Sequence, residues 1–148
     1  AAEVVLHAHR EGLISVLWMY PRGRAVKDEK DPHLIAGAAG IACVLGSDFV
    51  KLHAPVRGNM NSSELLKETV IAAGRCGVIC VGGPKISARE FLKEIYDQIH
   101  VAGTCGVAVG RNIFQRPLDE GVRMANGLSA IIYKNSSVKE AYKIFLGK

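Results

Sequence analysis

The sequence predicts an α/β fold built from four consecutive strand–helix units. Four short apolar segments rich in Val and Ile begin about 30 residues apart, which is the size of a βα unit. They are apolar on both faces, as parallel strands buried between two layers are. Capped amphipathic segments lie between them, as expected of helices that connect parallel strands. The predicted strands are residues 13–20, 48–53, 77–81 and 106–109.

Helices are predicted around these strands because capping residues and glycines punctuate each connection. A helix through about His9 precedes the first strand. Two Ser-x-x-Glu sequences, at Ser87 and Ser137, have the form of capping boxes. The later helices are expected to begin at Asp31 with Pro32, at Asn61 or Ser62, at Ser87, at Pro117 and at Ser137, and the first three of them to end at Gly46, Gly74 and Gly103.

Two architectures contain four such units: a small doubly wound open sheet, and half of a (β/α)8 barrel of about 250 residues. Side-chain alternation favours the barrel. Trp18 and Tyr20 share one face of the first strand, whereas Phe49, Lys51 and His53 share one face of the second. A barrel interior offers such polar side chains a common end to point into, and a sheet covered by helices on both faces does not.

Composition excludes several classes of protein. Hydrophobic residues make up 49% of the 148 residues and charged residues 22%, which indicates one globular domain. Neither an apolar run of membrane-spanning length nor a secretory signal is present, so no membrane partner is expected. The net charge of +5 is scattered without a nucleic-acid motif, so phosphorylated metabolites are favoured over nucleic acid as partners. The cysteines predict reduced, buried thiols and a cytoplasmic location; they are Cys43, Cys76, Cys80 and Cys105.

Lys51 is the first candidate for a catalytic residue. It interrupts residues 47–53, which otherwise have the composition of a buried strand. A cationic side chain there costs desolvation free energy unless the amine is paired or neutral. A lysine kept neutral in an apolar site is a nucleophile toward carbonyl carbon. The alternative is a lysine that extends to the strand end or pairs with a neighbouring acid.

Tyr20 is the second candidate, because it ends the first strand directly before Pro21. The carboxyl ends of barrel strands carry catalytic groups, and a phenol there could relay a proton to or from a bound carbonyl. The alternative is a core tyrosine with its hydroxyl satisfied. Trp18 is expected to be a packed wall. Arg22 begins a charged loop, residues 22–31, and lies nearest the strand end, so it is the loop residue expected to meet a substrate.

Two glycine-rich turns follow the last two predicted strands, at residues 81–85 and 109–112. Glycines let the backbone approach an anion closely, and the exposed N–H groups then donate to it. Barrels often bind phosphate at the ends of strands seven and eight. The turns therefore predict a phosphate site, unless their glycines merely start βα loops. The residues concerned are Gly82, Gly83 and Lys85 in one turn and Gly110 and Arg111 in the other.

Several strings of residues together resemble one family. They are residues 17–23, 27–32, 48–51, 82–85 and 106–115. On these strings and the separation from Tyr20 to Lys51, the chain resembles the archaeal-type (DhnA-type) class I fructose-bisphosphate aldolases of the DeoC/FbaB-like aldolase family. The resemblance covers essentially the whole chain. It implies that residues 1–148 are the C-terminal half of a (β/α)8 TIM barrel, strands five to eight.

The resemblance also implies an activity and roles. Lys51 would be the Schiff-base lysine and Tyr20 the proton-transfer residue, with Trp18 lining the site. No metal or other cofactor is implied, because the iminium itself is the electron sink. The implied lyase reaction is the reversible cleavage of fructose 1,6-bisphosphate to dihydroxyacetone phosphate and glyceraldehyde 3-phosphate, in glycolysis and gluconeogenesis. The residues implied to hold a substrate phosphate are Gly82, Gly83, Gly110 and Arg111.

Two departures leave other functions open. The carboxylate that assists proton transfer in the family lies on its first strand and has no counterpart here, and residues 52–55 differ from the most familiar form. The alternatives are a related phosphosugar aldolase or transaldolase-type condensing enzyme and a non-catalytic phosphometabolite-binding half-barrel. Open sheet edges predict association, either with a complementary half-barrel or as a homo-oligomer.

Overall fold

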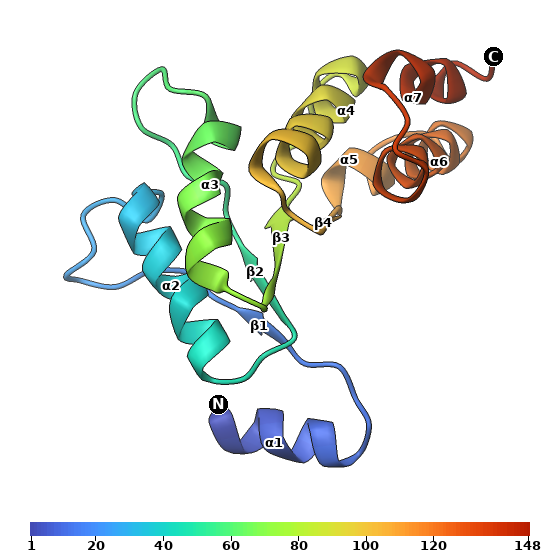
Figure 1. The fold of residues 1–148 in the computed structure, drawn as a ribbon. Coiled ribbons are helices and arrows are strands. Elements are labelled where there is room, and N and C mark those ends of the chain that lie inside the picture. Colours follow the sequence, from blue (N-terminus) through green and yellow to red (C-terminus); the bar gives the residue numbers. More distant parts are fainter.

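The computed structural model describes residues 1–148 and contains one four-stranded parallel sheet with helices along it (Figure 1). The strands are β1 (Val16–Trp18), β2 (Phe49–Leu52), β3 (Gly77–Val81) and β4 (Gly106–Ala108). The helices are α1 (Ala2–Arg10), α2 (Pro32–Val44), α3 (Ser62–Ala73), α4 (Ala88–Asp97), the π-helical turn η1 (Gln98–Ala102), α5 (Arg111–Phe114), α6 (Leu118–Lys134) and α7 (Val138–Phe145). The predicted α/β class is confirmed.

The strands lie side by side in chain order, β1-β2-β3-β4. A doubly wound sheet reverses its strand order at a switch point, and no such reversal occurs here. The register aligns Trp18 with Lys51, Lys51 with Ile79, and Ile79 with Gly106. The structure therefore favours the barrel-type connection over the open, doubly wound alternative.

β1 is shorter than the predicted residues 13–20. Leu13 donates its N–H to Ala8, and Ser15 donates its N–H to the carboxylate of Asp48 at 2.7 Å. Only the Ser15 carbonyl, which accepts from the N–H of Phe49 at 3.1 Å, bonds to β2 there. β1 also has only one neighbouring strand, which leaves its other edge unpaired. Local hydrogen bonds thus replaced strand pairing over the first part of the apolar run.

Four of the predicted helix starts are confirmed by hydrogen-bonded caps, and α6 follows Pro117 as predicted but without a side-chain cap. The side chains of Asp31, Asn61 and Ser87 accept from backbone N–H groups in the first turns of α2, α3 and α4. Ser137 and Glu140 form the reciprocal capping box predicted for the last helix. Two elements were not predicted: the helix expected to run to Gly103 changes to the π turn η1, and the short α5 precedes α6.

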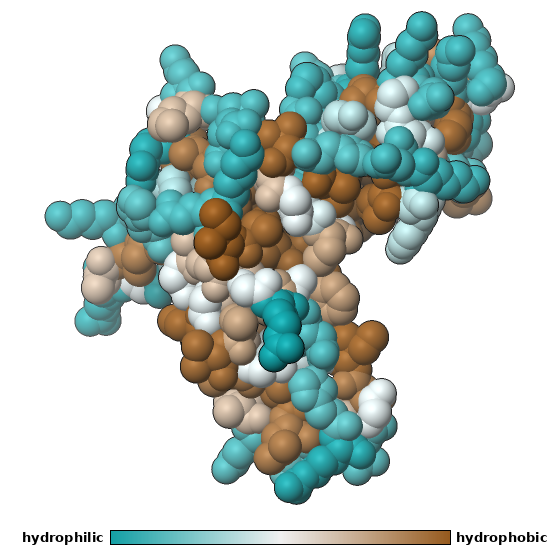
Figure 2. Space-filling view, in the orientation of Figure 1, coloured by the Kyte–Doolittle hydropathy of each residue, from teal (hydrophilic) through white to brown (hydrophobic).

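The hydrophobic core lies on one face of the sheet. Val50 and Leu52 point toward α2 and α3 and are fully buried, whereas Phe49 and Lys51 alternate onto the opposite face and are only half-buried. A second apolar cluster joins α4, α6 and α7 beside β4. Apolar residues, brown in Figure 2, gather across the middle of the molecule, with hydrophilic residues toward its ends. The opposite face of β1 and β2 thus has no helix layer.

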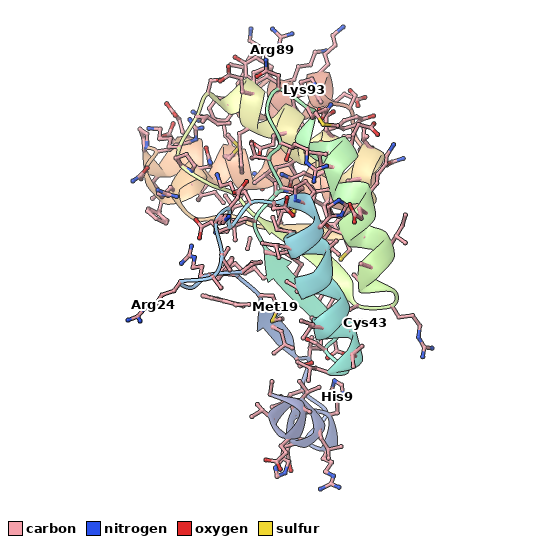
Figure 3. All side chains as sticks on the ribbon, turned by 90° about the vertical axis from the view of Figure 1, so that its left-hand side faces the viewer. His9, Met19, Arg24, Cys43, Arg89 and Lys93 are labelled. Carbon is pink, nitrogen blue, oxygen red and sulfur yellow. The ribbon has the colours of Figure 1, made fainter.

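The amino ends of the strands are joined to α1 by polar contacts. Asp48 accepts from Ser15 N–H, from Ser15 Oγ at 2.9 Å and from His9 Nε2 at 2.8 Å. The Ser15 N–H and then the His9 imidazole hold the pKa of the Asp48 carboxyl well below its usual range. His9 lies where α1 approaches the sheet (Figure 3). These bonds fix α1 at the end of the sheet opposite the glycine turns.

All four cysteines are free, but the expectation of buried thiols is correct only for Cys76 and Cys80. Cys43, in the last turn of α2, is half-buried, and Cys105, directly before β4, is exposed. Separately, none of the helices combines the length and the apolar character needed to cross a membrane.

Gly77 provides a test of the packing at the uncovered face. An added Cβ would lie 2.6 Å from Phe49 Cδ1 and 2.7 Å from Cys105 Sγ. Gly77→Ala should therefore lower the free energy of unfolding by about 1–3 kcal/mol. Gly40→Ala is the control, because its Cβ would make only an ordinary 3.6 Å contact with the Ala72 carbonyl and should stabilise α2 by up to about 1 kcal/mol. The midpoints of denaturant-induced unfolding measure the stability of the two variants. Equal midpoints would contradict the close packing around Gly77.

Candidate functional site

Lys51 occupies the uncovered face of the sheet without an acidic partner. Its Nζ lies 3.6 Å from the ring centroid of Trp18, its register partner on β1. None of the salt bridges in the structure includes Lys51. The alternative of a lysine paired with a neighbouring acid is therefore not observed, and the amine rests on an aromatic face.

A cavity of about 410 Å³ opens at the carboxyl ends of the last three strands. The carboxyl ends of parallel strands meet at one edge of a sheet, so residues distant in sequence converge there. Lys51 reaches this cavity from β2, and the two glycine turns reach it from β3 and β4. The lining residues are Lys51, His53, Val81, Gly82, Gly83, Ala108, Gly110, Arg111 and Phe114.

The two glycine turns are built differently. Gly82 donates its N–H to the carbonyl of Ala108, which continues the sheet beyond β3. Gly83 has φ of 60°, a conformation that disfavours other residues. Gly110 packs against Phe114, since an added Cβ would lie 3.1 Å from Phe114 Cε1. Gly83 and Gly110 thus have local reasons to be glycine, and both turns line the cavity.

Tyr20, Arg22 and His53 form a cluster at the rim of the cavity. The rings of Tyr20 and His53 have centroids 4.8 Å apart, and Arg22 Nη2 donates to His53 Nε2 at 3.4 Å. Glu29 accepts from Arg22 Nε at 2.7 Å and so holds the guanidinium in place. Burial raises the pKa of the Tyr20 phenol, and the Arg22 charge opposes this. Tyr20 is therefore protonated at neutral pH.

His53 is a cavity residue that the sequence reasoning did not select. An arginine only donates hydrogen bonds, so His53 Nε2 must accept and the imidazole facing Arg22 must be neutral. Burial and then the Arg22 charge lower the pKa of His53, which agrees with this protonation state. The available signal was its position two residues after Lys51, on the same face of the strand.

Trp18 and Tyr20 also line a second, apolar cavity of about 440 Å³ between β1 and α2. Trp18 is 66% exposed there, because nothing pairs with the outer edge of β1. Trp18, which was expected to be a packed wall of the site, is thus packed only on the side that faces Lys51. Met19 lies near the same edge, and Arg24 extends away from the body of the chain (Figure 3).

Lys85 lies apart from the other predicted phosphate residues. Its Nζ donates to the backbone carbonyl of Gln115 at 2.7 Å, and the side chain does not line the cavity of Lys51. The structure therefore brings Lys51 together with both glycine turns and Arg111. It places Trp18, Tyr20 and Arg22 next to this group.

The fold and the cavity define a parallel α/β protein whose strand ends surround one site. A family model of the DeoC/LacD family aldolases matches residues 1–116. The chain belongs to this aldolase family, which confirms the resemblance seen in the sequence.

Individual relatives match nearly the whole chain. It is 54% identical over 147 residues to the fructose-bisphosphate aldolase/6-deoxy-5-ketofructose 1-phosphate synthase of Methanocaldococcus jannaschii, covering 99% of this chain and 47% of that protein. A solved fructose-bisphosphate aldolase from Slackia heliotrinireducens superposes with a TM-score of 0.94 at 50% identity, over 99% of this chain and 46% of that one.

A second solved structure, an archaeal fructose-1,6-bisphosphate aldolase with its catalytic lysine bound to the carbinolamine intermediate, has a TM-score of 0.75 at 33% identity. The match covers 89% of this chain and 50% of that one. The chain thus spans about half the length of the relatives it matches.

The His53 cluster predicts a titration. The pKa of His53 should lie below the ordinary histidine value of 6.5, and Arg22→Gln should raise it, although burial should keep it below 6.5. Lys30→Gln should raise it less. The unfolded chain takes up this proton first as pH falls. The destabilisation by His53 should therefore build up between the two pKa values, keep its full size below them and be absent above them. NMR titration of the imidazole Cε1–H measures the pKa; a value of 6.5 or above in the unsubstituted chain would contradict the cluster.

Proposed function

We propose that this chain is the C-terminal half, strands five to eight, of a class I fructose-bisphosphate aldolase barrel. The reaction would be the reversible cleavage of fructose 1,6-bisphosphate to dihydroxyacetone phosphate and glyceraldehyde 3-phosphate, in glycolysis and gluconeogenesis. The observation that carries this proposal is the position of Lys51, which has no acidic partner and faces the same cavity as two glycine turns. The names and the half-length coverage of the relatives support it.

In the proposed mechanism, Lys51 Nζ attacks the C2 ketone of the open-chain sugar. The carbinolamine loses water to give an iminium, which accepts the electron pair when the C3–C4 bond breaks. The C4 hydroxyl gives up its proton as glyceraldehyde 3-phosphate leaves. The enamine then takes a proton at C3, and water releases dihydroxyacetone phosphate. Tyr20, which is protonated at neutral pH and lies at the rim, is the chain's proposed proton-transfer group.

The proposed phosphate contacts come from backbone and charge together. Gly82, Gly83 and Gly110 allow close approach, and Arg111 supplies positive charge at the same cavity. His53, which accepts from Arg22, is a further polar residue of the same cavity. Lys51 would meet the reacting carbons, and the glycine turns with Arg111 would meet a phosphate.

The remaining half of the barrel would cover the uncovered face and both open edges. β1 and β4 each have a single strand neighbour. An apolar cavity lies beside each edge: one between β1 and α2, and another of about 460 Å³ along α5 and α6. Trp18 in the first cavity is 66% exposed, and Phe114 and Leu118 in the second are 70% and 85% exposed. We infer a partner with four more βα units, in the same polypeptide, in a complementary chain or in a second copy.

The nucleophile assignment predicts a covalent adduct. Borohydride reduction in the presence of dihydroxyacetone phosphate, followed by peptide mass mapping, should place the adduct on Lys51. Lys51→Arg should abolish turnover, since arginine stays protonated and cannot attack the ketone. Lys85→Arg is the matched control and should retain activity, because that amine contacts only a backbone carbonyl. An adduct on Lys85, or none in an active sample, would contradict the assignment.

The phosphate assignment predicts that Gly83→Val weakens phosphorylated ligands roughly tenfold or more, about 1.4 kcal/mol, by blocking approach to the backbone. Gly12→Val is the matched control. Both glycines have positive φ, of 60° and 71°, with open space around an added Cβ, but Gly12 lies at the opposite end of the sheet. Both variants should lose about 1–2 kcal/mol of stability, and only Gly83→Val should raise KM. Equal KM values in the two variants would argue for a plain turn.

A further inference from the structure

Asn112 is a fully buried polar residue that the mechanism above does not use. It lies in the short α5, directly after Arg111, and its side chain has no exposed surface. It does not line the cavity of Lys51. A buried amide needs hydrogen-bond partners, and the partners of Asn112 show what it does.

All partners of the Asn112 side chain lie in the loop after β3, within residues 82–86. Nδ2 donates to the carbonyl of Gly82 at 2.8 Å and to that of Pro84 at 2.9 Å. Oδ1 accepts the N–H of Ile86 at 3.1 Å. The loop after β3 is therefore wrapped around one side chain that belongs to the loop after β4.

Neighbouring residues strengthen the same connection. Arg116, whose side chain is only 6% exposed, donates from Nε to the Asn112 carbonyl and from Nη2 to the Ile86 carbonyl, each at 2.8 Å. Lys85 Nζ donates to the Gln115 carbonyl at 2.7 Å. The two turns thus form one hydrogen-bonded body rather than two separate loops.

The geometry of the peptide bond links Asn112 to the anion site. In a trans peptide the C=O and the following N–H point in opposite directions, and the chain contains no cis peptide bond. Because the Gly82 carbonyl is held toward Asn112, the N–H of Gly83 is turned to the other side. The Pro84 carbonyl and the Lys85 N–H are related in the same way. Neither of these two N–H groups donates to an acceptor within the chain.

We propose that Asn112 is a positioning residue that turns the backbone N–H groups of the Gly83 loop toward the phosphate of the substrate. This inference rests on the proposed function, because it assumes that the glycine turns bind phosphate. Asn112 would touch neither substrate nor reacting atoms. Its side chain would set the orientation of the turn, with Arg116 holding Asn112 and Ile86 in place.

The test compares a phosphorylated with an unphosphorylated ketone. Asn112→Asp keeps the shape of the side chain but replaces both donated hydrogen bonds with carboxylate oxygen facing two carbonyls. Asn112→Ser is the milder variant, with one hydroxyl donor. Both substitutions are made in this chain and assayed in the assembled protein, with whichever of the three proposed partners supplies the other half. Borohydride trapping measures imine formation at Lys51 with dihydroxyacetone phosphate and with dihydroxyacetone.

The expected result is at least a tenfold loss of apparent affinity for dihydroxyacetone phosphate in both variants, with unchanged trapping of dihydroxyacetone. For fructose 1,6-bisphosphate, KM should rise more than kcat falls. Ile131→Ala, a buried substitution in α6, controls for lost stability and should affect both ketones alike. Asn112 variants that keep the wild-type preference for the phosphorylated ketone would overturn this inference alone. A wild-type protein without that preference would overturn the phosphate site and this inference with it.

Discussion

The in-register parallel pairing of β1, β2 and β3 is the constraint on which the rest of the structure depends. It places Trp18, Lys51 and Ile79 in one row across the sheet. Since side chains alternate along a strand, burying Val50 and Leu52 under α2 and α3 forces Lys51 onto the opposite face. A shift of one residue would bury the lysine and expose the core, so the register that builds the fold also positions the candidate nucleophile.

The strands and the loops of the site supply different groups. β2 places Lys51 in register with Trp18 of β1, and the Lys51 amine lies 3.6 Å from the centroid of the Trp18 ring. The loops after β3 and β4 supply backbone groups, and the buried side chain of Asn112 joins them. Loops that follow different strands are not held together by the sheet itself. Hydrogen bonds between the two loops therefore fix their relative positions around the cavity.

Much of this arrangement follows from local sequence signals. Capping residues such as Asp31 and Ser137 marked helix starts because their hydrogen bonds are made within a few residues. Lys51 was conspicuous because a charge in an apolar strand carries a desolvation cost. Three contacts could not be read from any local pattern, because each joins residues roughly 30 positions apart. They are the contact of His53 with Arg22, that of Lys85 with Gln115, and those of Asn112 with the loop after β3.

The central claim is that this chain is half of a barrel whose uncovered face carries the site. Light scattering of the 148-residue chain at micromolar concentration tests it most directly. The account predicts that the chain does not persist as a monomer, and that it associates with itself or with a complementary half-barrel to cover its two open edges. A monodisperse, cooperatively folding monomer of 15.9 kDa would contradict the account, because the exposed apolar edges would then need no partner.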